Sequence, residues 1–452
     1  MNTVFRLPKD TEMNLTLLEE LIGKHRLQVS QRYEKLYNMY TSDHDILHGD
    51  AKPAYKPDNR IVSNFAKYIV DTMNGFFIGN PIKITADDEN VSAFVEYLDQ
   101  YNDQDDNNAE LSKICSIYGH GYEMYYVNED SELCITYLNP MEAFMAFDDS
   151  ILERPLYFVR VYKDYLNNEY GSISNDGYIR RFKLSGGIHW TSEWEPHYFD
   201  GVPATEYIEN AERQGIFEPI TTIINAYNKA LSEKANDVDY FADAYLKILG
   251  ALVEADDIRF IRDNRVLNLV GEGSEKIIAE FMDKPSNDTA QENLLNRLEK
   301  LAFQISMVAN ISDENFGAST GIALKYKLQA MSNLEKTKER KFTSGMNRRY
   351  KILFSHPLSK VSKDAWVGLH FVFTPNFPAN LLEETQIASQ LEGVVSDETK
   401  LKVLSIVDNV QEELERIKEE NKAPEITPIE RAMFGDTTLP PDEQEEENDG
   451  DE

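Results

Sequence analysis

The spacing of apolar residues predicts helices in the first hundred or so residues. Between residues 15 and 40, apolar side chains recur at three- and four-residue steps, which indicates an amphipathic helix. A turn-rich segment with Gly49 and two prolines follows, and a second helical pattern runs from Ile61 to Met73 before Pro81 ends it. Residues 91–101 and 109–118 predict two more helices, separated by the acidic, asparagine-rich segment NDQDDNN.

The pattern then changes to alternation, which predicts strands up to about residue 215. Polar turns separate the strand-like segments YEMYYV, LCITYLN, FMAFDD, LYFVRVYK, YIRRFKL and IHWTSEW. Helices followed by a run of strands are typical of an α+β body. We therefore expect the first half of the chain to fold as one mixed body that is rich in helix.

Helical spacing returns after Phe217 and predicts a long helix over about 219–249. A compact stretch with strand-like runs follows, then a second helix over 286–310 with Ser286 or Asp288 as its N-cap. A third helix of more than thirty residues starts at Gly321, which is unusually long for a globular domain. A strand in WVGLHFVFTPNFPAN, two or three short helices and the acidic tail PPDEQEEENDGDE complete the chain, and the tail is expected to be disordered.

Composition limits the class of protein. A chain of 452 residues with 41% apolar residues can bury a sizeable core, and its length allows roughly three average domains. The two cysteines fit a reducing compartment, and no Cys/His cluster has the spacing of a metal site. No apolar run is long enough to span a membrane, and the N-terminus lacks the features of a signal peptide. We therefore expect the protein in the cytoplasm or in an assembly built there.

The net charge of −33 argues against tight wrapping of DNA, because such binding needs many bases to neutralise phosphates. One segment departs from this acidity. Between Gly321 and Lys351, nine bases face only Glu335 and Glu339, which leaves +7 locally and −40 on the rest of the chain. Two interpretations remain open: a helix whose bases pair with acidic neighbours, or a helix that contacts a polyanion. Both hold if different faces of the helix have different roles.

The segment SDENFGASTGIALKYK, from Ser312 to Lys327, has two glycines and a following base, as phosphate-binding loops do. Its spacing does not fit a Walker A loop, because Gly317 and Gly321 are four apart and no Ser or Thr follows Lys325. Carboxylate pairs are frequent enough to arise by chance, and the turn around His120 needs no ligand to explain its glycines. We therefore expect no catalytic residues, no cofactor and no metal.

The order of these elements resembles the portal proteins of tailed double-stranded DNA bacteriophages, of the type found in siphophages of Gram-positive hosts. The stretches that carry the resemblance are NRIVSNFAKYIVDTMNGFFIGNPI (59–82), LNPMEAFMAFDD (138–149), FEPITTIINAYNKALSEKANDVDYFADAYL (217–246), STGIALKYKLQAM (319–331) and the segment 371–420. No single motif is sharp, but their order covers nearly the whole chain except the acidic tail.

The resemblance implies a portal fold that assembles into a ring, dodecameric in the virion. It assigns 1–218 to the wing, 219–246 and 286–309 to the stem helices, and 247–285 to the clip. It further assigns 310–321 to the tunnel loop, 322–378 to the long helix and a wing strand, 379–435 to the crown helices, and 436–452 to the acidic tail. The implied function is the channel at one capsid vertex through which viral DNA is packaged and ejected.

The same resemblance implies the site residues and the partners. The channel loop would comprise Ser312, Asp313, Glu314, Asn315, Phe316, Gly317, Ser319, Thr320 and Gly321. Lys325 and Lys327 are candidates for contact with the DNA backbone. Candidates for docking the terminase on the clip are Glu254, Asp256, Asp257, Arg259, Arg262 and Asp263. The implied partners are further copies of the chain, double-stranded DNA, the large terminase, the major capsid and scaffolding proteins, and a head-completion or adaptor protein, with no membrane.

Small polar residues and glycines in the loop suit a constriction that touches moving DNA without reading its sequence. A carboxylate-rich tunnel would repel phosphates, so that DNA passes without sticking. Two other classes remain as alternatives: an acidic cytoplasmic enzyme such as a metal-dependent nuclease, and a scaffold whose long helices serve only oligomerisation. Phe316 itself is equally compatible with contact to DNA and with burial against a neighbouring subunit.

Overall fold

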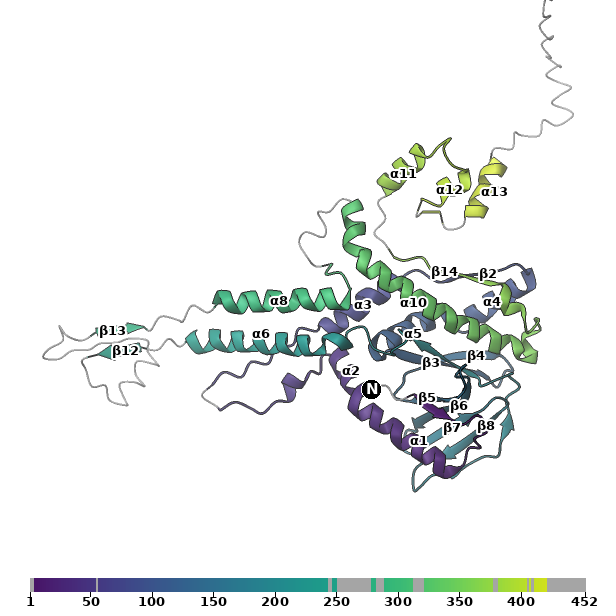
Figure 1. Ribbon diagram of the computed structural model, residues 1–452, viewed down its shortest axis with the longest axis horizontal. Helices are drawn as coiled ribbons and strands as arrows, with labels where there is room; N and C mark the ends of the chain where they lie inside the picture. Colours follow the sequence, from purple (N-terminus) through teal and green to yellow (C-terminus); the bar gives the residue numbers. More distant parts are fainter. Residues whose placement is uncertain are drawn as a thin grey trace, which may run out of the picture. The chain divides into compact units, whose positions relative to one another are not determined.

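The computed structural model describes residues 4–53, 56–242, 246–249, 278–281, 288–311, 321–376, 381–404, 406–407 and 410–420. The chain divides into two compact units, Met1–Asn376 and Phe377–Glu452, and each is described by itself. The first unit mixes helices with sheets (Figure 1), as the sequence predicted.

Two antiparallel sheets form the centre of the first unit. The larger has the strand order β1-β5-β6-β7-β8-β10, and β9 also pairs with β8. Its strands are β1 (Phe5–Leu7), β5 (Ala143–Asp148), β6 (Pro155–Lys163), β7 (Glu169–Ser174), β8 (Tyr178–Lys183), β9 (His189–Trp190) and β10 (Glu195–Pro196). The smaller sheet has the order β11-β3-β4, from β11 (Ala204–Ile208), β3 (His120–Val127) and β4 (Leu133–Leu138). Within the larger sheet, β1 departs from the antiparallel pattern because it pairs with β5 in parallel.

The N-terminal helical segment covers one face of the larger sheet (Figure 1). It consists of α1 (Leu15–Gln28), a π-helical turn (Val29–Tyr33) and α2 (Glu34–Tyr40), so the predicted helix over 15–40 is confirmed with one wide turn inside it. Asn14 caps α1 by accepting a hydrogen bond from the Leu17 backbone N–H at 2.9 Å. The buried side of α1 packs against apolar residues of β5, β6, β7 and β8.

The opposite face of the larger sheet packs on the smaller sheet through a separate apolar cluster that includes Tyr122, Leu138 and Phe158. Beyond the smaller sheet lies the main core of the unit. It is built from α3 (Phe65–Ile78), α4 (Glu89–Tyr101), α5 (Gln104–Tyr118) and the 35-residue helix α10 (Gly321–Ser355). A two-stranded sheet of β2 (Lys83–Ala86) and β14 (Leu369–Val372) lies beside these helices.

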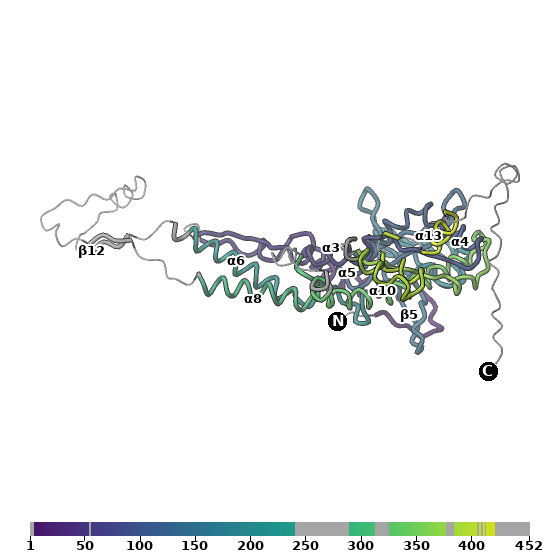
Figure 2. Tube along the Cα trace, turned by 90° about the horizontal axis from the view of Figure 1, so that it is seen from above, coloured from purple at the N-terminus to yellow at the C-terminus, as the bar shows by residue number. Residues whose placement is uncertain are grey.

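Two further helices, α6 (Thr221–Ala242) and α8 (Asp288–Ser306), lie side by side (Figures 1 and 2). A 3-10 turn over Glu218–Ile220 leads into α6. Lys234 pairs with Glu292 between the two helices, and the Gln291 amide donates to Asp237 at 2.8 Å. Two short strands, β12 (Leu246–Leu249) and β13 (Ile278–Phe281), form an antiparallel pair between the two helices in sequence.

A ladder of buried polar side chains on α6 holds the extended segment that precedes α3. Asn228, Ser232 and Asn236 lie one turn apart and accept hydrogen bonds from the backbone N–H groups of Ser63, Ile61 and Asn59, at 2.8, 2.9 and 2.6 Å. Four helical residues advance about 6 Å, which matches two residues of extended chain. Because the two spacings match, three side chains of α6 can accept hydrogen bonds from three backbone N–H groups that are not paired with a strand.

Four predictions about local structure need correction. The helix predicted over about 219–249 does not include its last four residues, because Leu246–Leu249 form the strand β12, which pairs with β13. The acidic segment NDQDDNN is mostly the start of α5, because Asp105 and Asp106 suit the first turn of a helix while Gln104 and Asn108 face the core. The helix predicted from Ile61 begins at Phe65, because residues 59–63 follow α6 instead. Trp366 belongs to a 3-10 turn (Ala365–Gly368) that precedes β14 rather than to the strand.

The second unit is helical where the structure describes it. Its helices are α11 (Leu381–Gln390), α12 (Asp397–Leu401) and α13 (Val410–Glu420), in line with the two or three short helices that the sequence predicted. Ser396 caps α12 by accepting from the Thr399 backbone N–H at 3.3 Å. The acidic tail lies outside the described residues.

Candidate functional site

The predicted channel loop and clip residues lie mostly outside the described residues. This applies to Ser312, Asp313, Glu314, Asn315, Phe316, Gly317, Ser319 and Thr320, and to Glu254, Asp256, Asp257, Arg259, Arg262 and Asp263. Gly321 is the first residue of α10, Lys325 lies in its second turn, and Lys327 is exposed one residue after Tyr326. The structure therefore describes the elements on both sides of the loop, and these define the candidate site.

The segment before the loop is held against α3. The backbone N–H of Ile311 donates to the Tyr68 hydroxyl at 2.9 Å, and the Asn310 amide donates to Glu299 at 3.1 Å. Phe303 of α8 makes edge-on contacts with Phe65 and Tyr68, with ring centroids 5.7 and 5.6 Å apart. Edge-to-face aromatic pairs of this kind add stabilisation beyond the area that they bury. The chain thus enters the loop from a fixed point.

The segment after the loop, α10, is anchored to the smaller sheet by a buried ion pair. Two guanidinium nitrogens of Arg349 donate to the two carboxylate oxygens of Glu123 at 2.6 and 2.8 Å, and both side chains are almost fully buried. The hydroxyls of Tyr125 and Tyr207 donate to the same carboxylate at 3.0 and 3.1 Å. Burial by itself would lower the pKa of Arg349, but the Glu123 carboxylate raises it well above its ordinary value.

A second buried pair lies about three helical turns earlier on α10. The Lys338 ammonium donates to Glu209 and to the Ser116 hydroxyl, both at 2.6 Å, and to the Ser112 carbonyl at 3.0 Å. All three ammonium protons therefore have acceptors, as a buried lysine requires. The two ion pairs fix both the rotation and the axial position of α10 relative to α5 and β11.

These two ion pairs distinguish between the two interpretations of the basic segment 321–351 for one side of the helix. Lys338 and Arg349 pair with acidic neighbours, which confirms the structural interpretation for the buried side of α10. Arg348 donates weakly to the carbonyls of Val202 and Ala204 at 3.3 and 3.4 Å. The exposed side carries Lys327, Lys336, Arg340 and Lys351, with Lys341 half-buried. One helix therefore has an anchored basic side and an exposed basic side.

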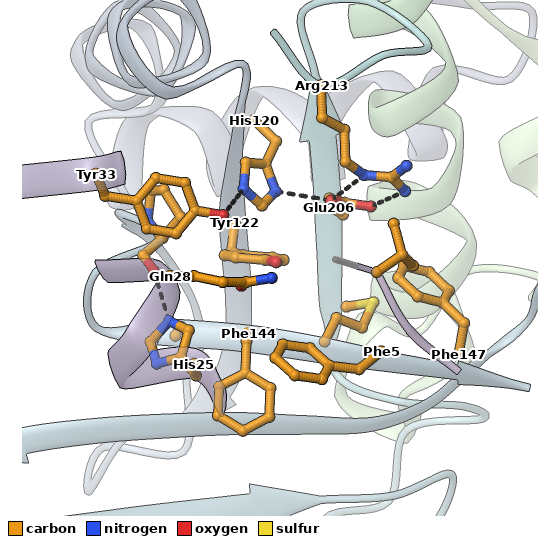
Figure 3. Close-up of a pocket in the computed structure, with 14 residues that line it drawn as sticks. Phe5, His25, Gln28, Tyr33, His120, Tyr122, Phe144, Phe147, Glu206 and Arg213 are labelled. Carbon is orange, nitrogen blue, oxygen red and sulfur yellow. Dashed lines mark hydrogen bonds and ion pairs between the residues drawn. The ribbon is translucent and has the colours of Figure 1, made fainter. Parts of the chain in front are cut away.

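A small cavity lies between the N-terminal segment and the two sheets (Figure 3). Its polar part is a chain of hydrogen bonds. The Tyr33 hydroxyl is bonded to His120 Nε2 at 2.8 Å, and a Glu206 carboxylate oxygen is bonded to His120 Nδ1 at 2.8 Å. Arg213 binds the same carboxylate with two nitrogens at 2.8 and 2.7 Å. Burial alone would raise the pKa of Glu206, but the hydrogen bonds from Arg213 and His120 lower it to about 2. The cavity has room for about one water molecule and no larger ligand, in a volume of about 20 Å³.

Several histidines of the first unit lie in buried or partly buried positions. Desolvation lowers the pKa of His25 to about 4, and it also lowers the pKa values of His44, His197 and His356. His25 Nε2 donates to the Pro140 carbonyl at 2.7 Å, which ties α1 to the turn before β5. Such groups bind protons more readily in the unfolded chain than in the folded one.

We therefore expect His25 to make the protein less stable as the pH falls from 6.5 toward 4. Relative to a His25→Gln variant, the wild type should lose about 3 kcal/mol of unfolding free energy between pH 7.5 and pH 4. The comparison with the variant cancels the opposite effect of Asp99, whose pKa burial raises to about 6. Urea titrations followed by circular dichroism at each pH measure the difference. Parallel pH profiles for the two proteins would contradict a neutral buried His25.

The acids of these buried networks and the polar residues on α6 were not singled out from the sequence. Glu123 is the single acid in the predicted strand YEMYYV, and a lone acid among buried aromatics is a signal for an internal ion pair. Asn228, Ser232 and Asn236 recur at four-residue steps in a helix, which is a second readable signal. The pairing of Lys338 with Glu209 has no local signal, because 129 residues separate the two.

The described residues contain no group of three or more His, Cys, Asp or Glu side chains that could hold a metal ion. Within the same residues, none of the helices combines the length and the apolar character needed to cross a membrane. Cys115 and Cys134 are both buried free thiols, and burial raises the pKa of each.

Comparisons with known proteins give a consistent result. The family described as phage portal protein, SPP1 Gp6-like, matches residues 19–425. The portal protein of Clostridium phage phiCD119 is 23% identical over 405 residues, which cover 82% of this chain and 87% of that relative. The portal protein of Bacillus phage SPP1 is 23% identical over 451 residues, which cover 90% of this chain and 87% of that relative.

Proposed function

The chain belongs to the SPP1 Gp6-like family of phage portal proteins, and we propose that it assembles into a ring whose bore carries double-stranded DNA. Family membership makes it a structural component of the virion that serves DNA packaging and ejection, rather than the metal-dependent nuclease considered as an alternative. The ring, its dodecameric state in the virion and its assembly in the host cytoplasm are parts of the proposal.

The regional assignment follows the order of the described elements. Residues 1–218 form the wing, with α6 and α8 as the stem helices of 219–246 and 286–309. Residues 247–285, which include β13 and most of β12, are the clip, and its charged residues, from Glu254 to Asp263, dock the large terminase and later the head-completion protein. The long helix and wing strand occupy 322–378, and the crown occupies 379–435. The major capsid and scaffolding proteins surround the ring.

One observation carries this proposal: the family match spans 19–425 and includes two adjacent helices, a short segment and a 35-residue helix in succession. The segment 310–321 is held at both ends. At its start, the Ile311 backbone N–H bonds to Tyr68 of α3, and at its end the helix α10 is fixed by its two buried ion pairs. A loop held at both ends on packed elements can maintain a constriction against a moving polymer. Its glycines and small polar side chains suit contact without sequence readout.

Bases beside the loop suit weak contact with DNA. Tight neutralisation of many phosphates would retain the duplex, whereas a few bases in an acidic bore touch the backbone without holding it. We therefore assign Phe316 to the constriction and Lys325 and Lys327 to backbone contact. No ATP-binding motif occurs in the sequence, so the energy for packaging comes from the terminase.

Two measurements test the proposal. Negative-stain images of the purified protein should show rings with a central hole. A phage that carries Phe316→Ala and Lys325→Ala should then form normal rings but fewer DNA-filled particles than the wild type. Tyr178→Ala with Lys363→Ala, which removes an exposed tyrosine and an exposed lysine of the wing, is the matched control and should fill normally. Monomers in the images would overturn the ring, and normal filling of the Phe316/Lys325 variant would overturn the loop assignment.

A further inference from the structure

The exposed side of α10 carries bases that the fold does not neutralise. Arg340 is exposed and Lys341 half-buried, and neither forms an ion pair with any acid in the described part of the chain. Lys336 nearby pairs with Glu339 on the same helix at 2.6 Å. On the opposite side, Lys338 and Arg349 are buried and paired. In a chain of net charge −33, an uncompensated basic face is an exception that calls for an acidic partner.

An acidic face of the same unit lies around α4 and the start of α5. Its exposed carboxylates are Asp87, Asp88, Glu89, Glu96, Asp103, Asp105 and Asp106. None of these seven forms an ion pair with a base among the described residues. Tyr97 and Tyr101 stack on each other beside them, with ring centroids 5.8 Å apart and exposed fractions of 48% and 41%. Carboxylates next to exposed tyrosine rings form a surface suited to a guanidinium group.

The two faces cannot satisfy each other within one chain. Helix α10 packs on β11 and α4 packs on β4, which are the two edge strands of the smaller sheet. Where α4 does reach α10, it meets the C-terminal end, through Tyr350 to Asp99 at 3.3 Å and Phe354 beside Phe94. Arg340 lies ten residues before Tyr350, which is about 15 Å along a helix.

From these observations we infer that the Arg340–Lys341 face of α10 docks on the α4–α5 acidic face of a second copy of the chain. Two different complementary faces on one subunit make a head-to-tail contact, which closes into a ring when the rotation allows it. The inference rests on the proposed ring and identifies one of its contact surfaces. Charge pairs of this kind set the register and the speed of association more than its final affinity.

A second copy explains more than a nucleic acid would. A polyanion accounts for the basic face but leaves the acidic face with its two tyrosines unexplained. A neighbouring subunit uses both faces in each contact, and it repeats the contact at every position of the ring. Contact of Arg340 and Lys341 with DNA is therefore a separate outcome that the experiment can reveal.

Charge reversal in the full-length protein tests the contact. Arg340→Glu with Lys341→Glu should abolish rings or slow their formation, and Glu96→Lys with Asp106→Lys should do the same from the other face. The four changes together should restore rings, because each face regains an opposite partner at the wild-type net charge. Mixed with the wild type, the fourfold variant should form mostly separate rings, because each mixed contact places like charges together at the exchanged positions. Native mass spectrometry and negative-stain images give the readout.

Matched controls separate the effect of a changed net charge from the effect of the position at which the charge is changed. Lys9→Glu with Lys35→Glu, and Glu19→Lys with Glu34→Lys, change the same charges at exposed sites on the N-terminal segment and should leave rings intact. A cysteine pair, Arg340→Cys with Glu96→Cys, adds a test that does not depend on reversal. Mild oxidation should yield a ladder of disulfide-linked oligomers, whereas either single cysteine should stop at dimers or monomers.

The outcomes separate this inference from the proposed ring. Wild-type rings together with unchanged rings in both reversal pairs, or with no cross-linked ladder, would overturn the contact but leave the ring. Wild-type monomers would overturn the ring and the contact together. Normal rings with a loss of DNA-filled particles in the Arg340/Lys341 variant would assign the basic face to DNA and overturn the inference.

Discussion

Replacing Glu123 with glutamine is expected to destabilise the first unit by about 3–5 kcal/mol, the largest single effect that this fold predicts. The change leaves the Arg349 guanidinium fully buried with only neutral acceptors, which are Asn108 Oδ1 at 2.6 Å and the amide oxygen of the substituted side chain. A guanidinium keeps its proton at any pH that proteins tolerate, so it cannot escape the low dielectric by becoming neutral. The buried positive charge therefore stays uncompensated.

The opposite replacement, Arg349→Met, is expected to cost less, and its cost should depend on pH. Without Arg349, the Glu123 carboxyl still receives hydrogen bonds from Tyr125, Tyr207 and Gln104, at 3.0, 3.1 and 3.2 Å. A carboxyl can also bind a proton when its counter-ion is lost, which removes the buried charge. The variant should therefore recover stability, relative to Glu123→Gln, as the pH falls from 8 to 5.

Urea unfolding of the two single variants and the double variant at pH 8 and pH 5 measures these differences. The double variant should be more stable than the sum of the two single losses predicts, because it removes both buried charges together. Equal losses for the two single variants at both pH values would contradict the asymmetry. A loss below about 1 kcal/mol for Glu123→Gln would show that water reaches the pair.

The sequence predicted the helices well where periodicity is local. Helix α10 followed from helical spacing over more than thirty residues, and α6 and α8 from their apolar stripes, although the pattern of α6 wrongly included the residues of β12. Strands were harder, because β1 has three residues and pairs with residues about 140 positions away. The NDQDDNN segment was wrong as a linker because its polarity serves a buried hydrogen-bond network around Arg349, which no window of sequence reveals.

The candidate site, like the fold, could be predicted from the sequence only in part. Charge counting found the unusual basic segment, but it could not separate Lys338 and Arg349, which are buried, from Arg340, which is exposed. That separation needs the rotation of α10, which the distant acids Glu123 and Glu209 fix. The assignment of 310–321 to the tunnel loop depends on the family resemblance, because glycines and small polar residues alone are typical of many loops.

The second large effect is expected at Gly345. Replacing this glycine with alanine should change the stability of the protein in the direction opposite to the usual one for a glycine inside a helix. Glycine inside a helix normally costs about 0.5–1 kcal/mol relative to alanine, so Gly→Ala usually stabilises. At Gly345 a Cβ would lie 2.4 Å from a ring carbon of Tyr207, whose hydroxyl is itself bonded to Glu123. Gly345→Ala should therefore destabilise the protein by about 1–3 kcal/mol, the range for overpacking a core.

Gly23 is the matched control, because it lies within α1, is exposed, and has no atom within 4 Å of an added Cβ. Gly23→Ala should stabilise by about 0.5–1 kcal/mol, while Gly345→Ala lowers the midpoint of thermal unfolding. A gain at both positions would mean that α10 can move away from β11, which would also weaken the case that the two buried ion pairs fix its position. A loss at Gly345 alone means that α10 and Tyr207 are in rigid contact, as a constriction supported by this helix requires.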